Sequence, residues 1–231
     1  MPPQCDSDPV WPDIDTTFEN VPVAIARTYP DYKDFEEVRE IEALYLKVIE
    51  EAEDTLYIES QYLASPKLAD AIAARLSEED GPEIILVLPR NAEGWLRQKA
   101  MDGARVRMLE HIWAHDTYGH FAAYYPVTAS EQPIYVHAKI LVMDGALIRV
   151  GSSNLNNRSM GFDTECDLVV EADLCGDQRD TVSKTISAKR DALIAEHLGV
   201  SEAAFHTARD EQGGSFIKAI ETLRGEGRSL R

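Results

Sequence analysis

The chain has 231 residues, of which 44% are hydrophobic, enough for one domain with a sizeable core. Its 41 acidic and 23 basic residues give a formal net charge of −18. This excess argues against broad, non-specific binding to nucleic acid, whose phosphates attract positive charge. The three cysteines, Cys5, Cys166 and Cys175, are scattered and form no C-x-x-C pair. A disulfide scaffold or a structural zinc site is therefore not expected.

The chain shows no targeting or membrane-spanning pattern. The first fifteen residues contain neither a basic n-region nor an apolar h-region. No apolar run approaches the roughly 20 residues that a membrane-spanning helix needs. We therefore expect neither a signal peptide nor a transmembrane segment in this chain, and a location in the cytoplasm or at the periphery of a membrane.

The first part of the chain differs in composition from the rest. Residues 1–35 are rich in Pro, Asp and Thr, which indicates an extended arm or linker. Residues 36–231 then read as a single domain, in which helical spacing alternates with apolar runs typical of strands. In chain order these patterns predict a helix at 34–54, a strand at 55–63, a helix at 65–80, a strand at 83–89, a helix at 93–114 and a strand at 121–127.

Two further strands are predicted around a turn at Asp144-Gly145, because Asp-Gly between apolar runs is a strong hairpin signal. A third strand is predicted from Glu165 to Ala172, and helices at about 178–198 and 214–224. Alternating helices and strands indicate an α/β fold. We expect a mixed, mainly parallel sheet flanked by helices on both faces.

The stretch "IYVHAKILV" carries a candidate site. Side chains alternate between the two faces of a strand, so His137 and Lys139 share one face. Val136, Ala138, Ile140 and Val142 share the other face. An imidazole beside an ammonium suits an anion, because the cation attracts it and the imidazole can attack it or transfer a proton near neutral pH.

Small polar residues follow the predicted hairpin. Gly151 permits backbone geometry closed to other residues. Ser152 and Asn154 offer neutral hydrogen-bond donors for phosphate oxygens. Glu165 supplies a carboxylate, the usual partner that fixes the tautomer of a working imidazole. Together these groups suit phosphoryl transfer without a metal or another cofactor.

These residues resemble the HKD motif of the phospholipase D superfamily. The "LYIESQYL" run at 56–63 is similar to the strand that opens the second half of two-motif phospholipases D. The resemblance implies that His137, Lys139, Asn154 and Glu165 are catalytic, and that Ser152, Gln61 and Tyr62 bind substrate. We expect Asp144 and Gly151 to be structural. The matching pattern is His137-x-Lys139-x4-Asp144-x6-Gly151-Ser152-x-Asn154.

The chain contains one H-x-K, whereas enzymes of this type carry two and place the active site between them. The resemblance therefore implies a C-terminal half whose first residues correspond to the link between halves. It implies a phosphohistidine intermediate, a phospholipid substrate at a membrane surface, and a partner that is a second HKD half or a second copy. In two-motif enzymes the nucleophile is usually assigned to the first motif, which makes His137 the general acid and base.

Two alternative functions and one candidate metal site stay open. The first is a homodimeric nuclease of the same superfamily, although the charge of −18 and the "IESQY" run weigh against nucleic acid as a partner. The second is a non-catalytic half that acts as a scaffold, although the motif is intact. The third concerns His111 and His115, whose i,i+4 spacing on a helix could serve a metal, but no H-E-x-x-H is present.

Overall fold

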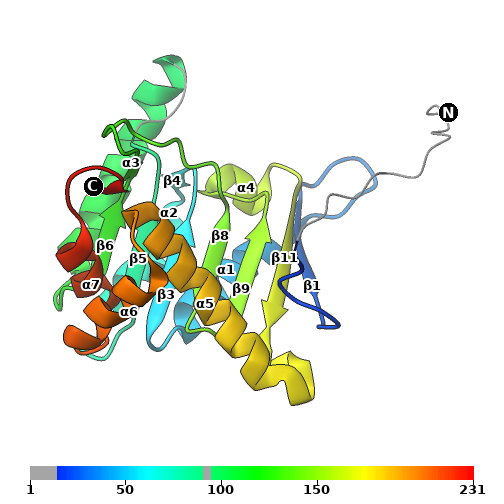
Figure 1. The fold of residues 1–231 in the computed structure, drawn as a ribbon. Coiled ribbons are helices and arrows are strands. Elements are labelled where there is room, and N and C mark those ends of the chain that lie inside the picture. The colour runs from blue at the N-terminus through cyan, green and yellow to red at the C-terminus, as the bar shows by residue number, and fades with distance from the viewer. Residues whose placement is uncertain (1–14, 91–94) are drawn as a thin grey trace, which may run out of the picture.

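An eight-stranded mixed sheet forms the centre of the protein (Figure 1). The computed structural model describes residues 15–90 and 95–231, with the side chains of 95–102 excepted. Among the described strands, β3, β5 and β6 pair in parallel, and the other five pairings in the sheet are antiparallel. In spatial order the strands are β2 (Val38–Arg39), β1 (Ala24–Tyr29), β11 (Glu165–Glu171), β9 (Leu147–Gly151), β8 (Ile140–Met143), β3 (Thr55–Glu59), β5 (Glu83–Val87) and β6 (Phe121–Tyr124).

Helices cover both faces of this sheet. On one face, α1 and α2 pack with part of α3 over Leu56 and Ile58; on the other, α5, α6 and α7 pack over Tyr57. Figure 1 shows α5 crossing one face of the sheet with α1 behind it. The helices are α1 (Glu40–Glu51), α2 (Pro66–Leu76), α3 (Trp95–His115), α4 (Asn157–Gly161), α5 (Arg179–Leu198), α6 (Glu202–Glu211) and α7 (Phe216–Leu223), with a 3-10 segment at Ala172–Gln178.

The expected α/β fold is confirmed: the main sheet is mixed, helices lie on both faces, and five of the eight strands described in this sheet (β1, β3, β5, β6 and β9) run in one direction. The parallel pairs stand where helices connect successive strands, as expected for crossover connections. No helix in the described ranges combines the length and the apolar character needed to cross a membrane.

The expected arm at 1–35 differs from the structure over Ala24–Tyr29. These residues form β1, which pairs antiparallel with β11 inside the main sheet. The physical reason is that the edge of β11 away from β9 offers unpaired backbone groups, and the alternating buried Ala26 and Thr28 fit a half-buried strand. The part of the expected arm before Asp15 lies outside the described residues.

The strand expected across "IYVHAKILV" is shorter than predicted, because β8 begins at Ile140. His137 and Lys139 therefore lie just before β8. One backbone bond extends the pairing toward them, since the Gly151 N–H donates to the Lys139 carbonyl at 3.2 Å. Two short sheets close the same end of the molecule, one from β4 (Leu63–Ala64) and β10 (Leu155–Asn156), the other from β7 (Pro126–Val127) and β12 (Ser229–Leu230).

The β8–β9 turn has the structural role expected for Asp144. Its backbone has a φ of 54°, and its carboxylate accepts from the N–H groups of Glu53 (2.8 Å), Asp54 (2.9 Å) and Thr55 (2.6 Å). The hairpin is thus joined to the start of β3. Asp144 lies at the end of β8 opposite to His137 and Lys139, so it braces the sheet at a distance from them.

We predict that Asp144→Ala lowers the free energy of unfolding by about 1–3 kcal/mol, because three backbone N–H groups lose their acceptor. Asp144→Asn is the matched control: it keeps one acceptor oxygen and tolerates positive φ. It should cost less than Asp144→Ala. Urea unfolding followed by circular dichroism measures both. Equal stability of all three proteins would contradict a structural role for this carboxylate.

Candidate active site

His137 and Lys139 lie on the opposite side of their segment from its apolar residues. Val136 and Val142 are buried in the core on the α5 face, with Ala138 and Ile140 packed against it. The imidazole of His137 is exposed, whereas the Lys139 side chain is only 8% exposed. A buried cation thus stands two residues from an exposed imidazole, while the apolar side chains of the segment pack in the core.

The Lys139 ammonium is held by two acceptors. It donates to the backbone carbonyl of His137 at 2.7 Å and to Oε1 of Gln61 at 3.2 Å. Burial lowers the pKa of Lys139, the nearby Arg149 guanidinium adds to this, and the Glu165 carboxylate opposes it. Lys139 and Glu165 are thus close enough to interact electrostatically. A desolvated cation of this kind attracts an anion more strongly than an exposed one.

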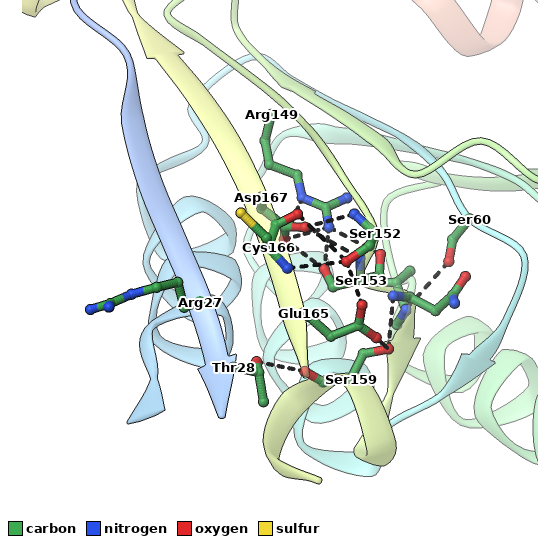
Figure 2. Close-up of polar contacts among 12 residues, drawn as sticks. Arg27, Thr28, Ser60, Arg149, Ser152, Ser153, Ser159, Glu165, Cys166 and Asp167 are labelled. Atoms are coloured by element: carbon green, nitrogen blue, oxygen red, sulfur yellow. Dashed lines mark hydrogen bonds and ion pairs between the residues drawn. The ribbon is translucent and has the colours of Figure 1, made fainter. Parts of the chain in front are cut away.

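The Glu165 carboxylate is held by two hydroxyl groups (Figure 2). Oε2 accepts from Ser152 Oγ at 2.5 Å and Oε1 accepts from Ser159 Oγ at 2.7 Å. The expected bond from His137 to Glu165 is not found. In the part of the chain that the structure describes, no hydrogen bond joins the His137 imidazole to the Glu165 carboxylate. Its two oxygens instead accept from the two serine hydroxyls.

Ser159 connects this carboxylate to the loop after β9. Its hydroxyl accepts from the Asn154 N–H at 3.0 Å, its own N–H donates to the Asn156 side chain at 2.8 Å as α4 begins, and its carbonyl accepts from Thr28 at 2.7 Å. The Asn154 side chain is buried, and its Oδ1 has no partner among the described residues. A buried amide without a partner is costly, so it stands as a candidate contact for a substrate.

Gly151 is structural for a different reason from the expected one. Its φ is not positive, in contrast to Gly145 at the preceding turn. A Cβ at Gly151 would collide with the Cα and the carboxylate of Asp167. Glycine is therefore required for close approach of β9 to β11, rather than for an unusual backbone conformation.

A buried ion pair lies beneath the loop, and the sequence analysis did not identify it. Arg149 and Asp167 are 1% and 0% exposed, and Arg149 Nε donates to Asp167 Oδ2 at 2.8 Å. Asp167 Oδ1 also accepts from the N–H groups of Ser152 (3.1 Å) and Ser153 (3.2 Å). Strand alternation could have found the pair, because Arg149 shares a face with Leu147, and Asp167 with Val169.

Gln61 follows β3 and faces the site, as expected from the resemblance. Besides accepting from Lys139, its side-chain amide donates to the hydroxyls of Tyr135 (2.8 Å) and Tyr62 (3.1 Å). Ser60 links this segment to the loop, because its Oγ accepts from the Leu155 N–H at 3.3 Å. Tyr135 was not predicted, although it stands two residues before His137 on the same alternating pattern.

Among the described residues, His111 and His115 contact an aspartate and a backbone carbonyl. His111 Nε2 lies 2.8 Å from Asp70, and His115 Nδ1 lies 2.8 Å from the His111 carbonyl. Across the described ranges, no group of three or more His, Cys, Asp and Glu residues is placed to hold a metal ion.

An apolar surface adjoins the site on the opposite face of the same strands. Val23, Ile25, Val150 and Leu168 are each at least half exposed. Ile25 pairs with Leu168, and Leu168 with Val150, so these three side chains lie side by side. Val150 immediately precedes Gly151 and the loop. We call these four residues the edge apolar surface. Exposed apolar side chains gathered in this way favour contact with another protein unit.

Residues 45–188, more than half of the chain, match the family model described as "Cardiolipin synthase, PLD-like domain". The chain belongs to the phospholipase D superfamily. The matched range includes Gln61, the H-x-K pair and Glu165. This supports a phosphodiesterase-type enzyme at the level of the superfamily.

A curated relative agrees with the phospholipase D assignment, and two solved structures share the fold. Phospholipase D zeta 1 of Arabidopsis thaliana is 25% identical over 232 residues, which cover 78% of this chain and 21% of that protein. The chain therefore spans about a fifth of the length of this relative. The structure of Haemophilus influenzae phosphatidylserine synthase has a TM-score of 0.55 at 15% identity, covering 76% of this chain and 38% of that one. NucT from Helicobacter pylori has a TM-score of 0.50 at 14% identity, covering 74% and 96%. These two structures support the fold alone.

We predict that Arg149→Met lowers the free energy of unfolding by about 3–5 kcal/mol, because it leaves the Asp167 carboxylate buried without its cation. Arg158→Met is the matched control, since the Arg158–Asp163 pair is exposed and should contribute about 1 kcal/mol or less. Chemical unfolding of both variants gives the comparison. Equal losses in the two would show that burial of the Arg149 pair has no special weight.

Lys139→Met should change how the stability of the protein depends on pH. The folded-state pKa of Lys139 lies below its unfolded value, so folding penalises the charged form at neutral pH. That penalty lessens as pH rises through the window just below the ordinary lysine value. Unfolding at pH 7 and at pH 9.5 should therefore show wild type gaining on Lys139→Met as pH rises. The opposite slope would contradict a desolvated Lys139.

Proposed function

We propose that this chain supplies one half of a two-histidine active site that cleaves or transfers phosphodiesters of phospholipids. The observation that carries the proposal is the buried Lys139 ammonium beside the exposed imidazole of His137. An anion drawn to the cation would lie next to a group that can attack phosphorus or transfer a proton. His137, Lys139, Asn154 and Glu165 are the proposed catalytic residues, and Ser152 and Tyr62 the proposed substrate contacts. Gln61, expected as a substrate contact, is instead proposed to support the site, because its amide already bonds to Lys139 and two tyrosines.

The chemistry needs two imidazoles with different tasks. One nitrogen attacks phosphorus and forms a P–N bond, while the P–O bond to the leaving alcohol breaks. The second imidazole gives its proton to the departing alkoxide, then removes a proton from water or from an acceptor alcohol. That oxygen attacks phosphorus, the P–N bond breaks, and the first imidazole is regenerated. Lys139 and Asn154 would stabilise the charge on the non-bridging oxygens, and no step in this scheme needs a metal.

This chain offers one H-x-K, so the second imidazole must come from a partner unit. Two features support such a partner. His137 is exposed and is free to face another unit, and the edge apolar surface lies on the strands that carry the site. We propose that a second HKD-bearing unit docks over this end of the strands, covering His137 and reaching round to the edge apolar surface, with the purified chain able to use a second copy of itself.

We predict that diester cleavage by the purified chain rises with protein concentration in step with dimer formation. The monomer should have little activity, because general acid–base assistance alone is worth roughly 10²–10⁴-fold and the covalent route would be lost. Cleavage of phosphatidylcholine in mixed micelles, with mass followed by light scattering, measures both. His137→Ala should remove the activity at every concentration.

Leu168→Glu tests the docking surface within the same experiment, and Val106→Glu is its matched control. Both residues are about half exposed, but Val106 lies on α3, away from the edge apolar surface. Leu168→Glu should shift association and activity to higher concentration, and Val106→Glu should not. Full activity in a strictly monomeric sample would contradict the need for a second histidine. Preferential cleavage of single-stranded DNA over phosphatidylcholine would favour the nuclease alternative.

A further inference from the structure

The Gln61 side chain joins Lys139 to two tyrosines. Its Oε1 accepts from the Lys139 ammonium at 3.2 Å, and its Nε2 donates to Tyr135 at 2.8 Å and Tyr62 at 3.1 Å. The orientation of this amide follows from chemistry. An ammonium has donors only, so it must face the amide oxygen, and the NH₂ group must face the tyrosines.

This orientation determines the role of the Tyr135 hydroxyl. The amide nitrogen has no acceptor lone pair, so the Tyr135 oxygen must accept from it, and the phenolic proton must be directed elsewhere. Tyr135 is partly exposed, and the bond with Gln61 is the one its side chain makes among the described residues. Its O–H is therefore available as a neutral donor close to the Lys139 ammonium.

We propose that Tyr135 is a substrate-contacting residue whose hydroxyl donates to a non-bridging oxygen of the phosphodiester held by Lys139. The inference rests on the proposed function. Two features make a neutral donor suitable at this point. Lys139 already supplies a desolvated positive charge, and a hydroxyl adds a directed bond to the anion without the cost of burying a second cation. Gln61 contributes by holding the Tyr135 oxygen in place, so Gln61 is a positioning residue for both groups.

The test is calorimetric titration of the purified chain with inorganic phosphate, which presents the same oxygens as the diester. We expect Tyr135→Phe to weaken phosphate binding by about tenfold or more, the usual effect of losing a hydrogen bond to a charged group. Lys139→Met should weaken it at least as much. Tyr118→Phe is the matched control, because this exposed tyrosine lies in the loop before β6, away from Lys139, and should bind phosphate like wild type.

Gln61→Met separates direct contact from a purely structural role. It removes the link between Tyr135 and Lys139 but leaves the Tyr135 hydroxyl, so it should weaken binding less than Tyr135→Phe. Wild-type affinity in Tyr135→Phe together with loss of binding in Lys139→Met would overturn the inference and leave the proposed function intact. Equal losses in Gln61→Met and Tyr135→Phe would also overturn it, because Tyr135 would then act only by supporting Gln61. No phosphate binding by wild type, or equal binding by Lys139→Met, would contradict the proposed function as well.

Discussion

The buried pair of Arg149 and Asp167 is the interaction on which the rest of the site depends. Arg149 also donates to the carbonyl and hydroxyl of Ser153, and its guanidinium lies 5.0 Å from the centre of the Tyr45 ring on α1. The Asp167 carboxylate accepts from the next two N–H groups after Gly151. Each charge thus has several partners, which offset much of the cost of burying the pair, although one guanidinium nitrogen of Arg149 has no hydrogen-bond partner among the described residues. The pair fixes β9, β11 and the intervening loop to one another and to a helix.

The Arg149–Asp167 pair determines where the reactive groups lie. With the loop held against Asp167, Ser152 can donate to one oxygen of Glu165, and Ser159 can donate to the other (Figure 2). The Ser159 hydroxyl also accepts from the Asn154 N–H. Just before β8, Lys139 donates to Gln61, which follows β3. The cation, the carboxylate and the neutral donors therefore come from separate segments that meet at one end of the sheet, a common place for sites in α/β folds.

The sequence predicted those features that depend on local pattern. Alternation separated His137 and Lys139 from Val136 and Ala138, and the Asp144-Gly145 turn was recognised with its structural role. Features that depend on tertiary contact were missed or misassigned. Strand β1 (Ala24–Tyr29) looked like an arm, because its short run becomes a strand only by pairing with β11. Helix α6 was absent from the predicted elements, although Ser201 caps it by accepting from the Ala204 N–H. The partners of Glu165 were misassigned because Ser152 and Ser159, which donate to it, come from segments that meet it only in the folded chain.

Hydrogen exchange at the Ser152 and Ser153 amides, observed by NMR, tests most directly whether the buried pair holds the site together. Both N–H groups lie in the loop and donate to Asp167 on β11, so we predict slow exchange in wild type. In Arg149→Met these two amides should exchange much faster, while amides in the middle of α5 change far less. Fast exchange of both amides in wild type, or protection that Arg149→Met leaves unchanged, would contradict the central place given to this ion pair.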